Sequence, residues 1–141
     1  MSLQINKIEK KGDASQEYLL MMATEDLNLE NYAVVDRTFD KNGDVSNLFR
    51  HTFRFPEKQV RKGDYVSLRT GSGTDETITL NDKPLHRFHW GSATPVWNDD
   101  SAESVEVWKV ATIDRKITGN PAPPKSTFSL RPKNLKYGSN K

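Results

Sequence analysis

Residues 60–68 read Val60-Arg61-Lys62-Gly63-Asp64-Tyr65-Val66-Ser67-Leu68, and this stretch decides the fold class. A Lys-Gly-Asp turn signal leads into residues that alternate between the two faces of a strand. The pattern recurs on both sides of this stretch, with turn residues between the runs. The quoted stretch predicts a strand over residues 64–69. The recurring pattern predicts further strands over residues 52–55, 76–80, 85–90 and 104–113. Such spacing is typical of an all-β sandwich with about seven to nine strands.

The first 44 residues extend this prediction. A strand is expected around Ile5 and Ile8, and a second over residues 17–23, whose apolar run suggests cover on both faces. A loop over residues 25–30 then precedes a strand at 32–36, and the Asn-Gly pair within 40–44 predicts a hairpin turn. A helix over residues 16–29 is the competing interpretation, because Leu, Met, Ala and Glu favour helices.

The C-terminal part changes in composition. Residues 104–110 alternate, with Val105 and Val107 on one face and Glu106 and Trp108 on the other. Residues 119–124 form a proline-rich linker that cannot join a central strand, and residues 126–130 are a candidate edge strand. We expect a mobile end over residues 131–141. The predicted division is therefore a sandwich domain over 1–114 and a linker with a basic tail over 115–141.

Composition excludes some classes of protein. The chain has 141 residues and no cysteine, so disulfides and thiolate metal sites are ruled out. No apolar run approaches the ~20 residues of a membrane-spanning helix. The first residues lack the basic-then-apolar pattern of a signal peptide, which favours the cytoplasm over secretion.

Charge is unevenly distributed along the chain. Residues 115–141 hold seven basic and no acidic side chains, which leaves 14 basic and 19 acidic side chains in the first 114 positions. A mildly acidic body thus carries a basic end, and a basic end with interleaved aromatic residues is able to bind a polyanion. The basic residues proposed for such binding are Lys125, Arg131, Lys133 and Lys136. The alternative is a solubilising terminus.

The order of several motifs resembles that of the lamin tail domain family, in its bacterial type. The motifs are Tyr18-Leu19-Leu20, 29–34, Phe53-Arg54-Phe55-Pro56, 60–68, Gly71-Ser72-Gly73, Trp90 and Val96-Trp97-Asn98. The resemblance covers about residues 3–113. It implies an immunoglobulin-like sandwich that binds protein, DNA or surface components, and it implies no catalytic residues.

The chain departs from the family pattern at two places. Tyr32 stands where members commonly have Trp, and residues 99–103 precede the last strand without the usual Asp-Gly turn. We therefore expect the last hairpin to differ from the family geometry while the fold is kept.

Four local features are candidate binding sites. The Gly71-Ser72-Gly73 loop resembles an anion cradle, but no helix is predicted after it, which favours a plain connecting loop. His86 and His89 are three residues apart and point to opposite faces of a strand, so they are predicted not to share a metal and to be surface or rim histidines. The loop with Asn98, Asp99, Asp100 and Glu103 is rich in oxygen ligands for Ca²⁺, although acidic loops are usually only solvated.

The fourth feature is the set of tryptophans. Trp90 and Trp97 lie beside the acidic loop in sequence, and either is able to form an exposed binding platform, although packing in the core is the competing explanation. No cofactor is expected, and no local signature places a nucleophile beside a base.

Three functions remain in order of preference. The first is a non-catalytic module that binds a protein partner through a sheet edge or loop. The second is a module that binds nucleic acid through the basic tail. The third is a hydrolase that acts on an extracellular polymer, which would need carboxylates that converge in a cleft.

Overall fold

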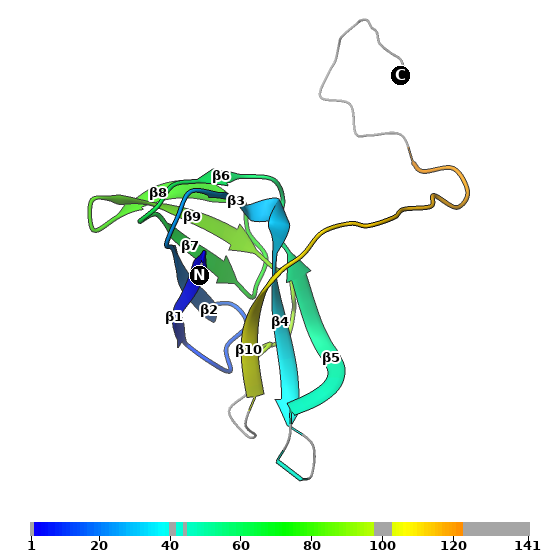
Figure 1. Cartoon of the computed structure of the whole chain (residues 1–141). Coiled ribbons are helices and arrows are strands. Elements are labelled where there is room, and N and C mark those ends of the chain that lie inside the picture. Colours follow the sequence, from blue (N-terminus) through cyan, green and yellow to red (C-terminus); the bar gives the residue numbers. More distant parts are fainter. Residues whose placement is uncertain (1, 40–41, 44, 98–102, 123–141) are drawn as a thin grey trace, which may run out of the picture. The chain divides into compact units, whose positions relative to one another are not determined.

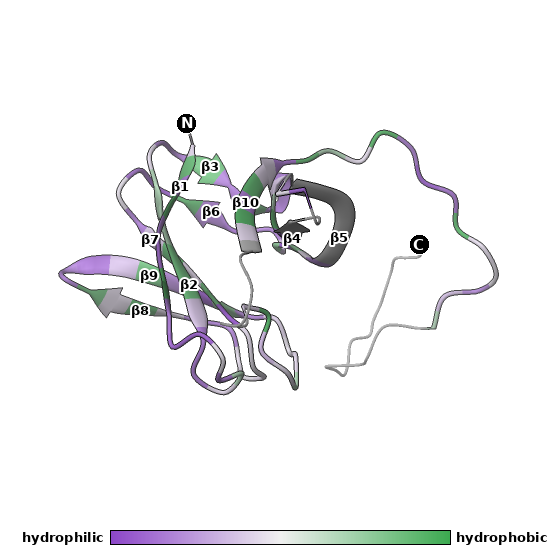
Figure 2. Cartoon of the chain, turned by 90° about the horizontal axis from the view of Figure 1, so that it is seen from below, coloured by the Kyte–Doolittle hydropathy of each residue, from purple (hydrophilic) through white to green (hydrophobic). Residues whose placement is uncertain are grey.

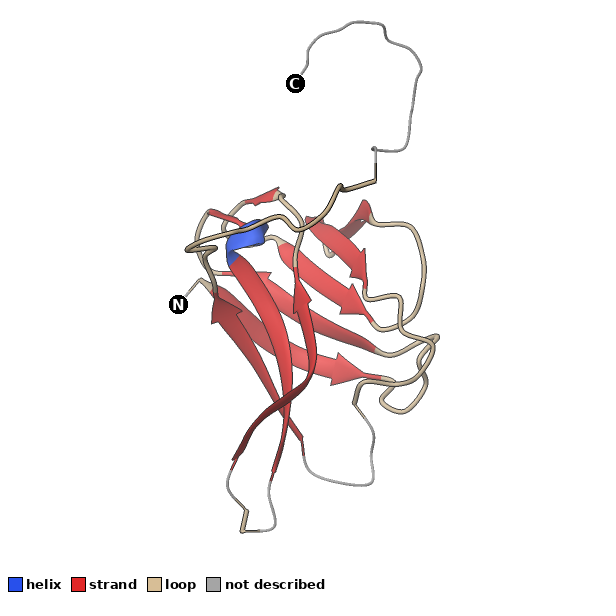
Figure 3. Cartoon of the chain, turned by 90° about the vertical axis from the view of Figure 1, so that its right-hand side faces the viewer, coloured by secondary structure: helices blue, strands red, loops and turns tan. Residues whose placement is uncertain are grey.

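The fold is an all-β sandwich, as predicted (Figure 1). A computed structural model describes residues 2–39, 42–43, 45–97 and 103–122 of the chain. Regular structure in the described residues is almost entirely strand, with one short 3-10 helix at Leu29–Asn31 (Figure 3). The ten strands found there are β1 (Leu3–Glu9), β2 (Tyr18–Ala23), β3 (Leu27–Asn28), β4 (Tyr32–Phe39), β5 (Val45–Arg54), β6 (Gln59–Val60), β7 (Tyr65–Arg69), β8 (Glu76–Leu80), β9 (Lys83–His89) and β10 (Glu103–Lys109).

Two sheets form the layers of the sandwich. A five-stranded sheet has the order β1-β2-β7-β9-β8, and a three-stranded sheet has the order β10-β4-β5. Strands β3 and β6 form a separate two-stranded pair. Figure 2 shows the two larger sheets on opposite sides of the view. All the strand pairs described are antiparallel except β7 and β9, which run parallel. Strand β8 comes between them in sequence but lies at the edge of the sheet, so the chain returns through β8 before β9 pairs with β7.

The core fills the space between the two larger sheets. Its members come from alternate positions of the strands, which is the period expected when one face of a strand is buried. The five-stranded sheet contributes residues such as Leu19, Met21 and Leu68, and the three-stranded sheet contributes Val34 and Val107. Aromatic rings pack edge to face at the centre, as expected for ring quadrupoles. The rings of this cluster are Phe53, Phe55, Phe88, Trp90 and Trp97.

Several boundaries differ from the sequence prediction. Residues 18–23 form a strand, so the helix alternative over 16–29 is wrong. The loop expected at 25–30 contains β3 and the start of the 3-10 helix, where the Asn28 side chain accepts a hydrogen bond from the Glu30 amide. The strand expected to reach residue 113 ends at Lys109, and Ile113 is 97 % exposed. Ten strands replace the predicted seven to nine because two-residue strands have too few positions to show a period.

One hairpin turn was not predicted. Strands β8 and β9 pair through Asn81 and Asp82, whose φ angles are 51° and 63°. Positive φ at both central residues suits the two-residue turns that follow the twist of a hairpin, and Asn and Asp tolerate it best after glycine. The predicted Asn42-Gly43 turn lies between the paired strands β4 and β5, and Gly43 has a φ of 86°.

A buried carboxylate ties three segments of the sandwich together. Glu17 is fully buried, and its Oε1 accepts hydrogen bonds from Thr70 Oγ1 at 2.5 Å and from the Val96 amide at 2.9 Å. Its Oε2 accepts from the amides of Gly12 at 3.1 Å and Trp97 at 3.2 Å. Four donors satisfy the carboxylate, which is the condition for burying such a group without a cation.

The chain divides into two compact units, Met1–Ala111 and Thr112–Lys141. The first contains all the strands described above. In the second, residues 112–122 are exposed and form no helix or strand. Within the described residues, no helix combines the length and the apolar character that crossing a lipid bilayer demands.

Candidate functional site

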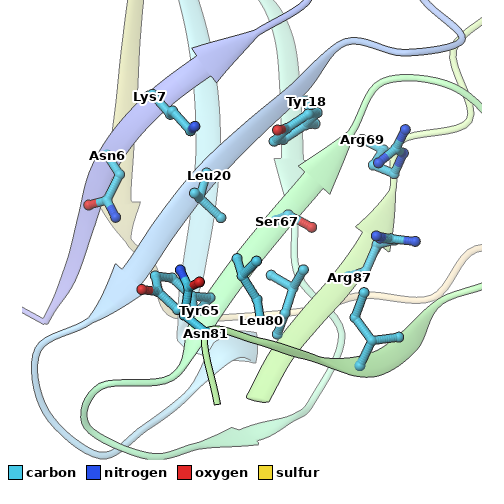
Figure 4. A pocket seen from close by; sticks show the side chains of 12 residues that line it. Asn6, Lys7, Tyr18, Leu20, Tyr65, Ser67, Arg69, Leu80, Asn81 and Arg87 are labelled. Atoms are coloured by element: carbon cyan, nitrogen blue, oxygen red, sulfur yellow. The ribbon is translucent and has the colours of Figure 1, made fainter. Parts of the chain in front are cut away.

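A groove of about 460 Å³ lies on the outer face of the five-stranded sheet, away from the core (Figure 4). All five strands of that sheet contribute to it. Its lining combines aliphatic, tyrosine, amide and cationic side chains, a mixture typical of ligand sites. The lining residues are Asn6, Lys7, Tyr18, Leu20, Tyr65, Ser67, Arg69, Ile78, Leu80, Asn81, Leu85 and Arg87.

Strand register explains why these residues share one face. Leu20 of β2 pairs with Ser67 of β7, and Ser67 pairs in turn with Arg87 of β9. Partner residues in adjacent strands point to the same side of a sheet. The next row contains Tyr18 and Arg69, which pair in the same way. The alternate residues of β2 and β7 belong to the core, so one face of these strands packs in the core and the other lines the groove.

The floor of the groove is aliphatic. Leu20 and Leu85 are buried although they lie on the outer face, and Ile78 and Leu80 are partly buried beside them. Exposed sheet faces normally carry polar residues at such positions. The prediction that residues 17–23 are covered on both faces agrees with the burial of Leu19, Leu20 and Met21.

The rim of the groove carries positive charge. The guanidinium of Arg69 lies 5.4 Å from the centre of the Tyr18 ring, a cation–π contact, and Arg69 has no acidic partner among the described residues. Arg87 Nη1 donates to Glu76 Oε2 at 2.9 Å. Lys7 Nζ lies 3.4 Å from Glu9 Oε1, and both side chains are exposed, so that pair contributes little. The rim is therefore cationic overall.

Two polar atoms in this region have no hydrogen-bond partner among the described residues. The Ser67 side-chain oxygen is buried, with the residue only 3 % exposed, and Arg87 Nε is buried as well. In Figure 4, Ser67 projects from β7 beside the two arginines. Buried polar atoms almost always have partners, so these two atoms make the groove a candidate ligand site.

A smaller hollow of about 220 Å³ lies beside β8 and is lined partly by Thr77, His86 and Phe88. His86 Nε2 lies 3.0 Å from Asp64 Oδ2, and its Nδ1 lies 3.2 Å from Thr77 Oγ1. Asp64 also accepts the Arg61 amide at 3.1 Å. Both ring nitrogens of His86 are thus occupied within the protein, and the array joins β8, β9 and the turn before β7.

Each histidine has one carboxylate partner. His51 Nδ1 lies 2.9 Å from Asp36 Oδ2, and His89 Nδ1 lies 3.1 Å from Asp75 Oδ1. The sequence prediction of surface or rim histidines is wrong for His86, which is buried because Asp64 and Thr77 satisfy its ring. Among the described residues, no three His, Asp or Glu side chains gather as a metal site would require.

The two glycines of the Gly71-Ser72-Gly73 loop are explained by close packing. A Cβ on Gly71 would lie 2.8 Å from the Ala14 carbonyl oxygen, and one on Gly73 would lie 2.5 Å from His89 Nε2. The loop joins β7 to β8, as the connecting-loop interpretation predicted.

The predicted tryptophan platform is not exposed at Trp97, which lies in the core and is 1 % exposed. Trp90 is partly buried and packs against His51, Phe53 and Trp97. Packing explains both positions. The remaining predicted binding residues lie outside the described part of the chain, namely Asn98, Asp99, Asp100, Lys125, Arg131, Lys133 and Lys136.

On the three-stranded sheet, Glu106 is the centre of a small polar network. Trp108 Nε1 donates to Glu106 Oε1 at 2.7 Å, and Arg37 Nη1 lies 3.4 Å from the same oxygen. The hydrogen bond from Trp108 and the charge of Arg37 lower the pKa of Glu106. This network is on the other sheet from the groove and belongs to the pairing of β10 with β4.

Sequence reasoning did not find the groove residues. The available signal was an aliphatic residue at some outward positions of several strands, such as Leu20, Leu80 and Leu85, where a solvated face would be polar. The chain matches no protein-family model, and no curated protein is significantly similar to it.

Proposed function

We propose that this chain is a non-catalytic binding module of the lamin-tail type, and that it holds an extended segment of a protein partner in the groove of the five-stranded sheet. The groove, with its aliphatic floor and cationic rim, is the observation that carries the proposal. The occupant that fits is a peptide with alternating apolar and acidic side chains. The motif series from Tyr18 to Asn98 supports the family, and its members are expected to bind other macromolecules.

The dimensions of the groove suit a short peptide. Five strands spaced ~4.8 Å apart span roughly 19 Å, which is the length of about six extended residues. Alternate side chains of such a peptide point the same way, so apolar ones are able to contact Leu20, Ile78 and Leu85 on the floor. The acidic side chains between them point away from the floor, toward the open side of the groove, where the positive charge of the rim from Arg69 and Arg87 favours them.

A single-stranded nucleic acid is the alternative occupant. Tyr18 and Tyr65 offer ring faces for bases, and the arginines offer charge for phosphates. Four aliphatic side chains on the floor favour peptide side chains over bases, because bases gain most from aromatic platforms. The basic tail is a second route to nucleic acid, and it includes the predicted residues Lys125, Arg131, Lys133 and Lys136.

A display selection tests the proposal. The full chain is used as bait for a library of random dodecapeptides, and we expect enrichment of sequences that alternate aliphatic and acidic residues. A synthetic peptide of the enriched sequence is then titrated into ¹⁵N-labelled protein. Amide shifts should change along β2, β7 and β9.

Charge and apolar variants sharpen the test. Arg69→Glu and Leu80→Glu should each weaken the enriched peptide at least tenfold, since one reverses the charge and the other places a charge in the floor. Lys109→Glu is the matched control, because Lys109 is exposed on β10 in the other sheet. No enrichment, or shifts confined to the three-stranded sheet, would overturn the proposal. Tighter binding of a labelled oligothymidine at the same residues would replace the peptide by nucleic acid.

A further inference from the structure

We infer that the groove contains a carboxylate-binding subsite formed by Ser67, Arg69 and Arg87. This inference rests on the proposed function and names the chemical group that the bound peptide must bring. The three side chains come from two parallel neighbouring strands, and Ser67 and Arg87 are direct partners in the β7–β9 register.

Ser67 supplies a donor at the base of the groove. Its hydroxyl is buried on the outer face and has no acceptor among the described residues. A buried hydroxyl without a partner costs free energy in the unliganded protein. An oxygen of a bound anion would remove that cost, and an apolar ligand group would not.

Arg87 supplies a planar fork. Its Nη1 donates to Glu76, while Nε is buried and has no partner in the part of the chain that the structure describes. The Nε–H and the N–H of Nη2 lie parallel on the other edge of the guanidinium, and that edge is the geometry that binds a carboxylate through two hydrogen bonds. Glu76 holds the guanidinium in orientation through its Nη1, and Nε on the other edge has no hydrogen-bond partner in the described chain.

Arg69 supplies the uncompensated charge. Glu76 neutralises one of the two arginines, and Arg69 rests over Tyr18 without an acidic partner in the described chain. One positive charge therefore remains for one negative charge of the ligand. A carboxylate matches both this charge and the planar fork of Arg87.

The carboxylate has two possible sources, a glutamate side chain and the C-terminus of the partner chain. Three fluorescein-labelled octapeptides separate them, each alternating valine with a second residue. The first alternates with glutamate and ends in an amide, the second alternates with glutamine and ends in a free carboxylate, and the third alternates with glutamine and ends in an amide. Binding to the full chain is measured by fluorescence anisotropy.

We expect the glutamate peptide or the free-carboxylate peptide to bind about tenfold or more tightly than the third peptide, which is the ratio for one charge-assisted pair of hydrogen bonds. Whichever of the two gains identifies the source. Arg87→Lys should remove most of that gain, because an ammonium keeps the charge and loses the fork. Ser67→Ala should reduce it about fivefold while the urea midpoint stays unchanged or rises, since no described residue is a partner of the hydroxyl.

The outcomes separate the two levels of the proposal. If all three peptides bind wild type equally and shift the groove amides, the groove binds peptide and the carboxylate subsite is wrong. If none binds and the selection also enriches nothing, the proposed function is wrong. Equal losses from Arg87→Lys and Lys109→Glu would show general charge attraction and would also overturn the subsite.

Discussion

Replacing Glu17 by glutamine tests whether the buried carboxylate holds the sandwich together. The change keeps the shape of the side chain and exchanges one acceptor oxygen for an NH₂ group. In the wild-type protein, four donors converge on the two carboxylate oxygens, from Gly12, Thr70, Val96 and Trp97. If the NH₂ group takes the Oε1 position, the buried Val96 N–H loses its acceptor and faces another donor. If it takes the Oε2 position, the Gly12 N–H loses its acceptor and the Trp97 N–H keeps only its longer contact with Oε1 at 3.4 Å.

The expected magnitude follows from these contacts. A hydrogen bond to a charged group contributes about 1.5–3 kcal/mol, and an orphaned buried donor costs about 1–3 kcal/mol. The donors that still face the amide oxygen of the glutamine keep a neutral acceptor, so only part of these contributions is lost. We therefore expect Glu17→Gln to lower the free energy of unfolding by about 2–4 kcal/mol. For a domain of this size that corresponds to a fall in Tm of roughly 8–16 °C.

Urea unfolding monitored by tryptophan fluorescence measures this change, since Trp97 lies in the core next to the carboxylate. Glu57→Gln is the matched control, because Glu57 is exposed and surface substitutions usually change stability by less than about 0.5 kcal/mol. Burying a charge is itself costly, and a neutral amide avoids that cost. A Glu17→Gln variant as stable as wild type would show that desolvation outweighs the four hydrogen bonds, and it would refute this reasoning.

Three further predictions concern other parts of the sandwich. Gly71→Ala should lower the free energy of unfolding by about 1–3 kcal/mol, because the new Cβ would meet the Ala14 carbonyl, whereas Ser72→Ala should be neutral in the same urea assay. His86→Ala should cost about 2–4 kcal/mol in that assay, because it leaves the buried Asp64 carboxylate without the imidazole. Because the folded-state pKa of Glu106 is lowered, its contribution to stability is complete above the pKa of the unfolded chain and is lost as pH falls through the folded value. The urea midpoint of Glu106→Gln should therefore approach that of wild type as the pH is lowered from about 6 to 3, and a constant difference would contradict this.

Residues 18–23 show what local sequence is able to predict. Leu19 and Met21 point to the core while Leu20 forms the groove floor, so both faces are apolar and the run resembles a buried helix segment. The strands predicted before and after this run favoured a strand over a helix, and the structure confirms the strand. Tertiary pairing with β1 and β7 then overrides the helix propensity of these residues.

The order of the strands left no comparable local signal. The parallel pairing of β7 with β9 requires β8 to lie at the edge of the sheet. Neither the hydrophobic period nor the turn residues between β7 and β9 specify that position. That pairing is what places Arg87 beside Ser67. The alternation of β7 showed that Tyr65, Ser67 and Arg69 share a face, but it could not show which residues of other strands lie next to them.

The buried carboxylate and the groove are connected through the β2–β7 pair. Glu17 precedes Tyr18, and Thr70 follows Arg69; the Thr70 amide donates to the Glu17 carbonyl at 3.0 Å, and the Thr70 hydroxyl donates to the Glu17 carboxylate. These contacts lie one residue beyond the Tyr18–Arg69 pair in the register. They therefore fix the end of the pair that holds the Arg69 guanidinium over the Tyr18 ring. If the Glu17 carboxylate sets this end, Glu17→Gln should weaken carboxylate binding in the groove even in protein that remains folded, whereas Glu57→Gln should not.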